Sequence, residues 1–244
     1  MVSIQNLSHA FDGRPVLSNI DLDVADGEIV AVMGSSGGGK TTLLRCVAGL
    51  LTPDSGKVEV GGFDVHSQTE EARHCMGMVF QSAALFDFMD VQSNVMFGVQ
   101  RWSQQPKSEH KSVVAEAIST VGLQGSEKLM PSELSGGMRK RVGIARALAL
   151  QPKLMLYDEP TTGLDPVTTY TIDKLISDVR DKFGTTSIVV SHDVSSVFRV
   201  ADRIAFLDGG VLTFTGDPEH FLEARVDSIR ELVHKAQATD FLRE

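Results

Sequence analysis

Cysteine is scarce in this sequence, and the two cysteines present form no recognisable pattern. Cys46 and Cys75 are the only ones among 244 residues, and no CxxC spacing occurs. A disulfide framework and a cysteine-based metal site are therefore excluded. The seven histidines are scattered along the chain without an HxxxH spacing, so we expect no zinc site either.

Long apolar runs and basic charge are also in short supply. No run approaches the ~20 apolar residues of a membrane-spanning helix, and the opening residues, MVSIQNLSHAFDG, lack the basic and apolar regions of a signal peptide. We therefore expect that the chain does not cross a membrane by itself. The formal net charge of −9 argues against nucleic acid or an anionic lipid surface as its main partner.

Alternation of strand-like and helix-like segments is the main feature that is present. Three short runs rich in valine, isoleucine or leucine are typical of buried strands: 28–34, 153–160 and 187–193. Residues 40–50 and 166–184 lie between such runs and have the features of helices. Because strand–helix–strand alternation implies parallel strands covered by helices, we predict an α/β fold.

The remaining segments add strands at the start and helices in the middle and at the end. Residues 2–11 and 16–28 alternate as strands do, and helical periodicity dominates from about 82 to 150. From about 218 to 244 we expect one tail helix, packed either on its own domain or on a partner. Its apolar stripe consists of Phe221, Leu222, Val226, Ile229, Leu232 and Val233.

A glycine-rich loop follows the first buried strand. Residues 34–41, GSSGGGKT, fit the phosphate-binding pattern G-x-x-x-x-G-K-[ST]. Glycines let successive backbone N–H groups face an anion, and the following helix points its positive end to the same place. Lys40 can then reach the β- and γ-phosphates, and the Thr41 hydroxyl is suited to bind Mg²⁺. The predicted ATP-binding residues of this loop are Gly34, Ser35, Ser36, Gly37, Gly38, Gly39, Lys40, Thr41 and Thr42.

The alternative is a plain glycine turn with a surface lysine, but the strand before it and the helix after it favour phosphate binding. Two acids and a histidine support the same chemistry. Asp158 ends the second buried run, where it can hold Mg²⁺ through water, and Glu159 can polarise an attacking water. His192 ends the third run and can reach the γ-phosphate or that water. Taken alone, each would be an ordinary loop residue, and the phosphate loop upstream favours a catalytic role.

The segment LSGGM, residues 134–138, opens the helical segment that follows it. Together with the ordered motifs around it, the sequence resembles the ATP-binding cassette (ABC) ATPases over residues from about 2 to 216. The resemblance implies a P-loop NTPase fold with a RecA-like parallel-sheet core, an N-terminal antiparallel β subdomain and a helical insert. It implies a single domain, 1–244, with the core at about 1–80 and 151–216 and the helical subdomain at about 82–150.

The same resemblance implies roles for further residues. Phe11 would stack on adenine, where tyrosine is commoner; Gln81 would contact Mg²⁺ and the water; and Asp165 would lie in the D-loop at a dimer interface. Ser135, Gly136 and Gly137 would cap the ATP held by Lys40 of a second, head-to-tail copy. His192 matches the H-switch. Met138 departs from the usual glutamine, which removes one amide near the nucleotide sugar. The implied metal residues are Thr41, Gln81 and Asp158.

Two segments, 80–95 and 129–152, are similar to the ATPases of Mla/Mce-type lipid-trafficking systems. That similarity implies ATP and Mg²⁺ as cofactors, phospholipid as cargo, and a homodimer of cassettes as the ATPase unit. The expected partners are integral-membrane permease subunits, with a lipid-binding Mce-type subunit as a further candidate, and the expected place is the cytoplasmic face of the inner membrane. Four residues would line the docking groove for a permease helix, or would equally pack in the core: Leu85, Phe86, Phe88 and Met89.

Three other function classes compete with this interpretation. Within transport, the alternative is an importer for amino acids or another small polar solute. An ABC ATPase of chromosome maintenance or translation would have long heptad arms or two fused cassettes, and the sequence has neither. A nucleotide-binding regulator without turnover would not need both Glu159 and His192.

Overall fold

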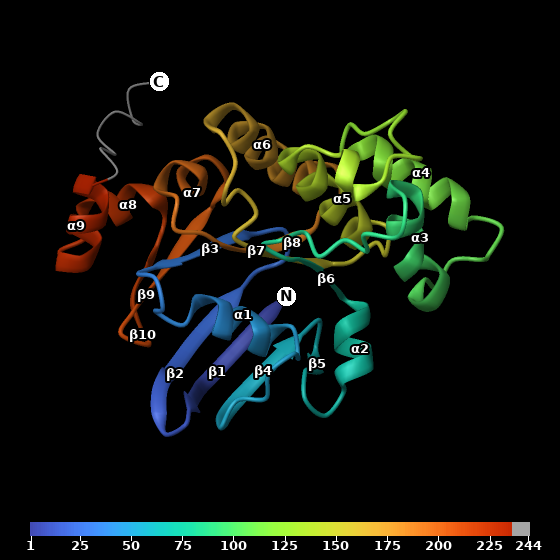
Figure 1. The fold of residues 1–244 in the computed structure, drawn as a ribbon. Helices are drawn as coiled ribbons and strands as arrows, with labels where there is room; N and C mark the ends of the chain where they lie inside the picture. The colour runs from blue at the N-terminus through green and yellow to red at the C-terminus, as the bar shows by residue number, and fades with distance from the viewer. Residues whose placement is uncertain (236–244) are drawn as a thin grey trace.

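A six-stranded sheet forms the centre of the computed structural model, which describes residues 1–235 (Figure 1). Its strand order is β10-β9-β3-β8-β7-β6, with β10 antiparallel to β9 and all other neighbours parallel. The strands are β3 (Ile29–Gly34), β6 (Met76–Val79), β7 (Leu154–Asp158), β8 (Thr186–Val190), β9 (Arg203–Asp208) and β10 (Val211–Gly216). β3, β7 and β8 are buried throughout, as their runs of branched residues predicted.

A second, antiparallel sheet lies below the first in Figure 1, with the order β2-β1-β4-β5. Its strands are β1 (Val2–Phe11), β2 (Arg14–Val24), β4 (Ser55–Val60) and β5 (Phe63–Asp64). β1 and β2 are joined through Asp12 and Gly13, both at positive φ, as two-residue hairpin turns require. This turn places Phe11 at the exposed end of the hairpin.

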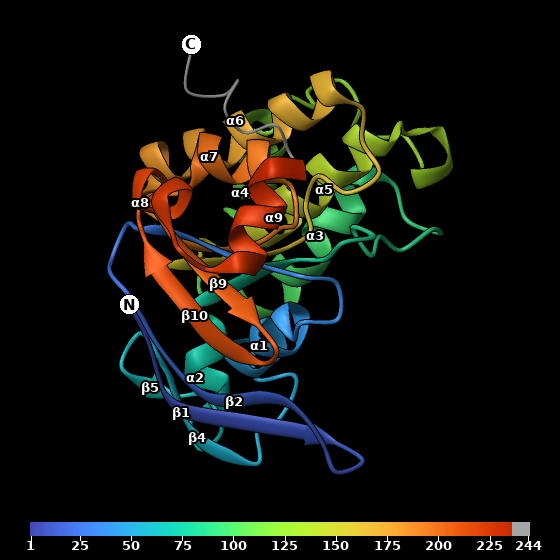
Figure 2. The ribbon, with the colours of Figure 1, turned by 90° about the vertical axis from the view of Figure 1, so that its left-hand side faces the viewer.

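Helix α1 (Lys40–Val47) packs between the two sheets (Figure 2). Its Leu43 and Leu44 share one apolar core with the small sheet and with Val30 and Val32 of β3. The alternate residues of β3 face the other side of the central sheet, where helices cover it. The predicted α/β architecture, with a mostly parallel central sheet and an antiparallel β sheet, is confirmed.

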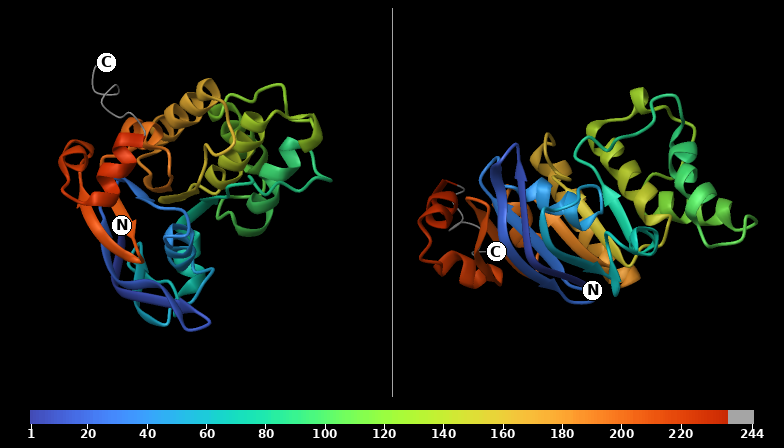
Figure 3. Two further views of the ribbon diagram at one scale, coloured as in Figure 1. Left: turned by 60° about the vertical axis from the view of Figure 1, so that its left-hand side comes forward. Right: turned by 90° about the horizontal axis from the view of Figure 1, so that it is seen from below.

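Helices cover the other face and extend to one side of the molecule (Figure 3). They are α3 (Val91–Trp102), α4 (His110–Thr120), a 3-10 turn (Pro131–Glu133), α5 (Gly136–Leu148), α6 (Pro166–Phe183) and α7 (Val194–Val200). Among residues 1–235, none of the helices is long and apolar enough to pass through a bilayer. Helix α2 (Thr69–His74) and strand β6 were not predicted from the sequence, because six and four residues are too short to show a period.

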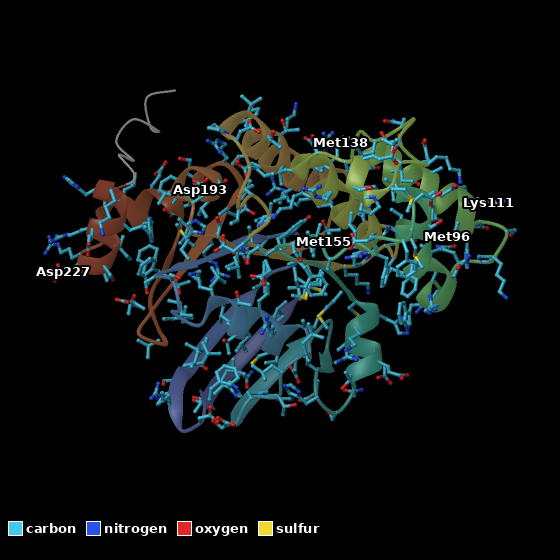
Figure 4. The ribbon with its side chains drawn as sticks, viewed as in Figure 1. Met96, Lys111, Met138, Met155, Asp193 and Asp227 are labelled. Atoms are coloured by element: carbon cyan, nitrogen blue, oxygen red, sulfur yellow. The ribbon has the colours of Figure 1, made fainter. Side chains whose placement is uncertain are left out.

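The tail differs from the single helix expected between about 218 and 244. It consists of α8 (Pro218–Glu223) and α9 (Asp227–Lys235), separated where Ala224 leaves the helical conformation; Figure 4 marks Asp227 at the start of α9. Phe221 and Ile229 are buried against the central sheet and α7, so this part of the stripe packs on its own chain. Residues 236–244 of the predicted helix lie outside the described residues.

Candidate functional site

The carboxyl ends of three adjacent strands, β3, β8 and β7, meet at one edge of the central sheet. Val32 of β3 pairs with Val190 of β8, which pairs in turn with Asp158 of β7. Beyond the strands, the backbone N–H of Glu159 donates to the carbonyl of Val190 at 3.0 Å. This pairing brings together loops that are far apart in the sequence, at the edge where open parallel sheets bind ligands.

The loop after β3 leaves no room for side chains at two of its glycines. A Cβ on Gly34 would lie 2.0 Å from the carbonyl oxygen of Leu207, and one on Gly39 would lie 2.8 Å from that of Val16. Gly39 has φ of 96° and directly precedes α1. The loop thus presents backbone without side chains at these glycines, directly before a helix N-terminus. Such a turn can bind a phosphate group through its backbone N–H groups.

Lys40 directs its ammonium group into this loop. Its Nζ donates to the carbonyls of Gly34 and Ser35, both at 2.9 Å, and the residue is only 8% exposed. Burial lowers the pKa of Lys40, while the nearby carboxylates of Glu159 and Asp158 act in the opposite direction. The loop therefore holds a buried cation close to the place where phosphate oxygens would lie.

Thr41 and Asp158 bring two oxygen atoms together beside the loop. The Thr41 hydroxyl donates to Asp158 Oδ1 at 3.0 Å, and burial raises the pKa of the Asp158 carboxyl. A divalent cation would offset the cost of burying this carboxylate, and hydroxyl and carboxylate oxygens are ligands that Mg²⁺ accepts. The residues present therefore fit a phosphate-bound Mg²⁺.

Glu159 has an uncommon backbone conformation, and two side chains contact its carboxylate. Its φ is 48°, a region that residues other than glycine uncommonly occupy. Oε2 accepts from Thr162 Oγ1 at 2.9 Å and lies 2.8 Å from His192 Nδ1. Within residues 1–235 no side chain donates to the other carboxylate oxygen, Oε1, so Oε1 can accept a proton from water.

These groups surround one pocket of about 340 Å³. Its lining consists of Val16, Ser36, Gly37, Gly38, Gly39, Lys40, Thr41, Thr42, Gln81, Glu159 and His192. Ten of these eleven residues were expected site residues, and the exception is Val16. Asp158 joins them through Thr41, and Gly34 and Ser35 through Lys40.

Phe11 lies apart from this lining. It is 47% exposed at the hairpin end, and its ring meets that of His9 edge to face with centroids 4.6 Å apart. An exposed aromatic ring at this place is free on one side to stack against a flat ligand, and the expected adenine contact stays a prediction.

The segment from Ser135 to Gly137 also lies outside the described lining of the pocket. Ser135 caps α5, since its hydroxyl accepts from the N–H of Met138 at 3.2 Å. A Cβ on Gly137 would lie 2.4 Å from the methyl group of Thr168, so glycine is required here for packing on α6. Asp165 caps α6 next to this contact. The segment lies in the helical layer, on the opposite face of the sheet from α1, where Figure 4 labels Met138.

Three contributors to the site were not predicted from the sequence. Val16 meets the loop only through its backbone, which no sequence pattern reveals. Thr162 follows Glu159 by three residues, a common spacing for a local hydrogen bond that could have been noticed. Lys140 contacts the backbone of both Gln81 and Glu159 and falls on the buried face of its helix with Gly137 and Ile144, a spacing that signals burial.

Comparison with known proteins agrees with this geometry. A family model described as "ABC transporter" matches residues 17–162. The intermembrane phospholipid transport ATP-binding protein MlaF of Escherichia coli K12 is 43% identical over 207 residues, covering 83% of this chain and 77% of MlaF. The methionine import ATP-binding protein MetN of Clostridium acetobutylicum is 40% identical over 237 residues, covering 96% and 74%.

Solved structures give the same result. A dimeric, post-hydrolysis structure of the ATP-binding cassette MJ0796 bound to ADP and Pi aligns with a TM-score of 0.81 and 29% sequence identity. The alignment covers 89% of this chain and 99% of that chain.

Replacing Lys40 by alanine tests whether the loop binds a nucleotide. Because the change removes a buried charge that would contact phosphate, we expect ATP affinity to fall by about 10- to 100-fold. Titration calorimetry with ATP and Mg²⁺ measures the change. The exposed Lys174 on α6 provides a matched control, and Lys174→Ala should leave affinity unaltered. Equal affinities in the two variants would show that the loop is not the phosphate site.

Proposed function

This chain belongs to the ABC transporter family and is an ATPase, and from that premise we propose that it powers the movement of phospholipid through membrane-embedded partner subunits. ATP hydrolysis is supported by three features that lie together at one pocket: the glycine loop, the Thr41–Asp158 pair and the Glu159–His192 pair. The lipid assignment is supported by the 43% identity to MlaF and by segments 80–95 and 129–152.

In the proposed reaction, residues 34–42 bind the triphosphate through backbone N–H groups and the Lys40 ammonium. Lys40 now donates to loop carbonyls and would exchange them for phosphate oxygens. Bound Mg²⁺, held by Thr41 and Asp158 with Gln81 beside them, would neutralise charge on the transferred phosphate. Glu159 Oε1 would accept a hydrogen bond from the attacking water, while Thr162 and His192 fix the carboxylate through Oε2.

Glu159→Gln tests the role of this carboxylate. The amide keeps the size of the side chain but cannot take a proton, so we expect ATP binding to persist while hydrolysis falls by about 100-fold or more. ATP affinity and steady-state phosphate release measure the two effects. Thr162→Val serves as a milder comparison, because it removes one contact that orients Glu159 and leaves the carboxylate in place. Normal turnover in Glu159→Gln would assign the proton transfer to another group.

The proposed active form is a head-to-tail dimer of two copies. Ser135 and the N-terminus of α5 lie outside the lining of the chain's own pocket, so a second copy would be needed to bring them to a nucleotide. MJ0796, which shares this fold, is dimeric in its post-hydrolysis structure. Each ATP would then lie between Lys40 of one copy and the Ser135 segment of the other, with Asp165 near the same interface.

Ser135→Arg tests this shared site. The longer side chain would block a nucleotide held by the other copy, so we expect ATP affinity of the monomer to stay within about twofold and hydrolysis to fall by at least about tenfold. Ser132→Arg is the matched control, because Ser132 is also exposed and lies three residues upstream in the 3-10 turn. Comparable hydrolysis in both variants would argue against capping by a second copy.

The proposed docking surface for a membrane partner lies on the segment after Gln81. Phe88 is 75% exposed, while Leu85, Phe86 and Met89 are half-buried. The ring of Phe86 packs on that of Phe97 in α3, with centroids 4.5 Å apart. The two alternatives for this segment therefore both contribute: Phe86 packs within the chain, and Phe88 is available to a permease helix. Through such a contact the chain would lie at the cytoplasmic face of the inner membrane.

An importer of amino acids is the second candidate, because identity to MetN is 40% over 96% of the chain. Purification from native membranes through a tag on this chain separates the two. For lipid transport we expect membrane-spanning chains, an Mce-type lipid-binding chain and phospholipid above the level of a mock purification. A co-eluting solute-binding protein with phospholipid at the mock level would support the importer and contradict the lipid assignment.

A further inference from the structure

Lys140 of α5 is a buried cation outside the pocket lining. It is 6% exposed, although lysine is almost never fully buried unless it is paired. Its Nζ donates to the backbone carbonyl of Gln81 at 2.6 Å and to that of Glu159 at 3.1 Å. Burial lowers the pKa of Lys140, and the carboxylates of Glu159 and Asp158 oppose that shift. The ammonium group thus replaces its lost hydration with two carbonyls from two separate loops.

The two carbonyls belong to residues whose side chains line the pocket. Gln81 follows β6 and Glu159 follows β7, and these strands are neighbours in the sheet. A carbonyl group is attached to the same Cα as the side chain, so fixing the carbonyl restricts the directions in which that side chain extends. Lys140, which is not in the pocket lining, therefore holds the backbone of both residues.

The backbone that Lys140 holds is strained on both loops. Glu159 has φ of 48°, and Ala83 and Ala84, just after Gln81, have φ of 61° and 46°. Such conformations cost of order 1–3 kcal/mol each and persist only where the surroundings enforce them. Without external contacts these loops would relax, and the side chains of Gln81 and Glu159 would lose their places.

Arg146, six residues further along α5, supplies contacts of the same kind. Its guanidinium donates to the carbonyls of Ala83 at 2.8 Å and Ala84 at 2.6 Å. Gly143 lies between the two cations on the helix, and a Cβ there would lie 3.4 Å from Ala83. Two cations and a close backbone approach thus hold residues 81–84 against a single helix.

We propose that Lys140 is a positioning residue for ATP hydrolysis. It holds the backbone of Gln81 and Glu159 so that their side chains keep the directions that catalysis needs, and this arrangement therefore depends on the position of α5. The proposal rests on the proposed function of Glu159. α5 begins with Ser135, five residues before Lys140, so the helix tip that would cap a nucleotide and the cation that holds the water-activating loop belong to one rigid element.

Methionine, arginine and glutamine substitutions at Lys140 in the full chain test this role. Lys140→Met keeps the length of the side chain but has no donor, so kcat should fall by about 10- to 100-fold while ATP affinity stays within about twofold. Lys140→Arg should restore most of kcat, and Lys140→Gln, which keeps a neutral donor, should lie between them. Lys174→Met is the control for loss of a lysine elsewhere and should behave as the unaltered protein. Steady-state kinetics, ATP titration and thermal melting are measured on each variant.

Unaltered kcat in Lys140→Met would overturn the proposal. So would equal losses of kcat and ATP affinity without rescue by arginine, because that pattern belongs to a purely structural lysine. If Lys140→Met does not fold, Lys140→Ala is measured in the same way, and failure of both to fold would assign the residue to stability and reject the proposal. Glu159→Gln separates this result from the proposed function: normal turnover there contradicts the role of Glu159, whatever Lys140 does.

Discussion

The hydrogen-bonded register of β3, β8 and β7 is the constraint on which the site depends. It places Val32, Asp158 and Val190 at one level, although 158 positions separate Val32 from Val190, so the loops that follow these residues begin side by side. The register also fixes the loops directly, since Glu159 N–H bonds to the carbonyl of Val190 and Ser191 N–H to that of Val32. A shift of one residue in any of the three strands would turn its buried residues to the opposite face and separate the catalytic groups.

The site also depends on buried charges, and its negative and positive groups compensate one another. Asp158 and Glu159 carry negative charge at a sheet edge where Lys40 and Lys140 are both nearly buried. Each lysine donates to two backbone carbonyls, so neither ammonium is left without partners in a region of low dielectric. Burial lowers the pKa of both lysines and the two carboxylates oppose that shift, so the four charges influence one another.

Features that depend on neighbouring residues could be predicted from the sequence. Contacts with backbone groups far away in the sequence could not. The glycine loop, Asp158, Glu159 and His192 were predictable because each stands next to a run of buried-strand residues. The contacts of Lys140 and Arg146 were not, because their acceptors are carbonyls 19 to 63 residues away whose direction depends on positive φ at ordinary residues. The tail break at Ala224 had no glycine or proline to mark it, and the second helix starts only where Ile229 can be buried.

The two buried lysines differ in whether a ligand can replace their carbonyl partners. That difference connects nucleotide binding with the position of α5 in the proposed mechanism. The carbonyl partners of Lys40 lie in its own loop, and Lys40 lines the pocket, so arriving phosphate oxygens can replace them. The partners of Lys140 belong to two separate loops, and Lys140 itself lies outside the pocket lining. Lys40 therefore responds to the nucleotide, whereas Lys140 responds to the position of α5. A catalytic arrangement that needs both lysines is complete only when the nucleotide is bound and α5 is packed in its place. Under this condition, hydrolysis can be coupled to the movement of a partner.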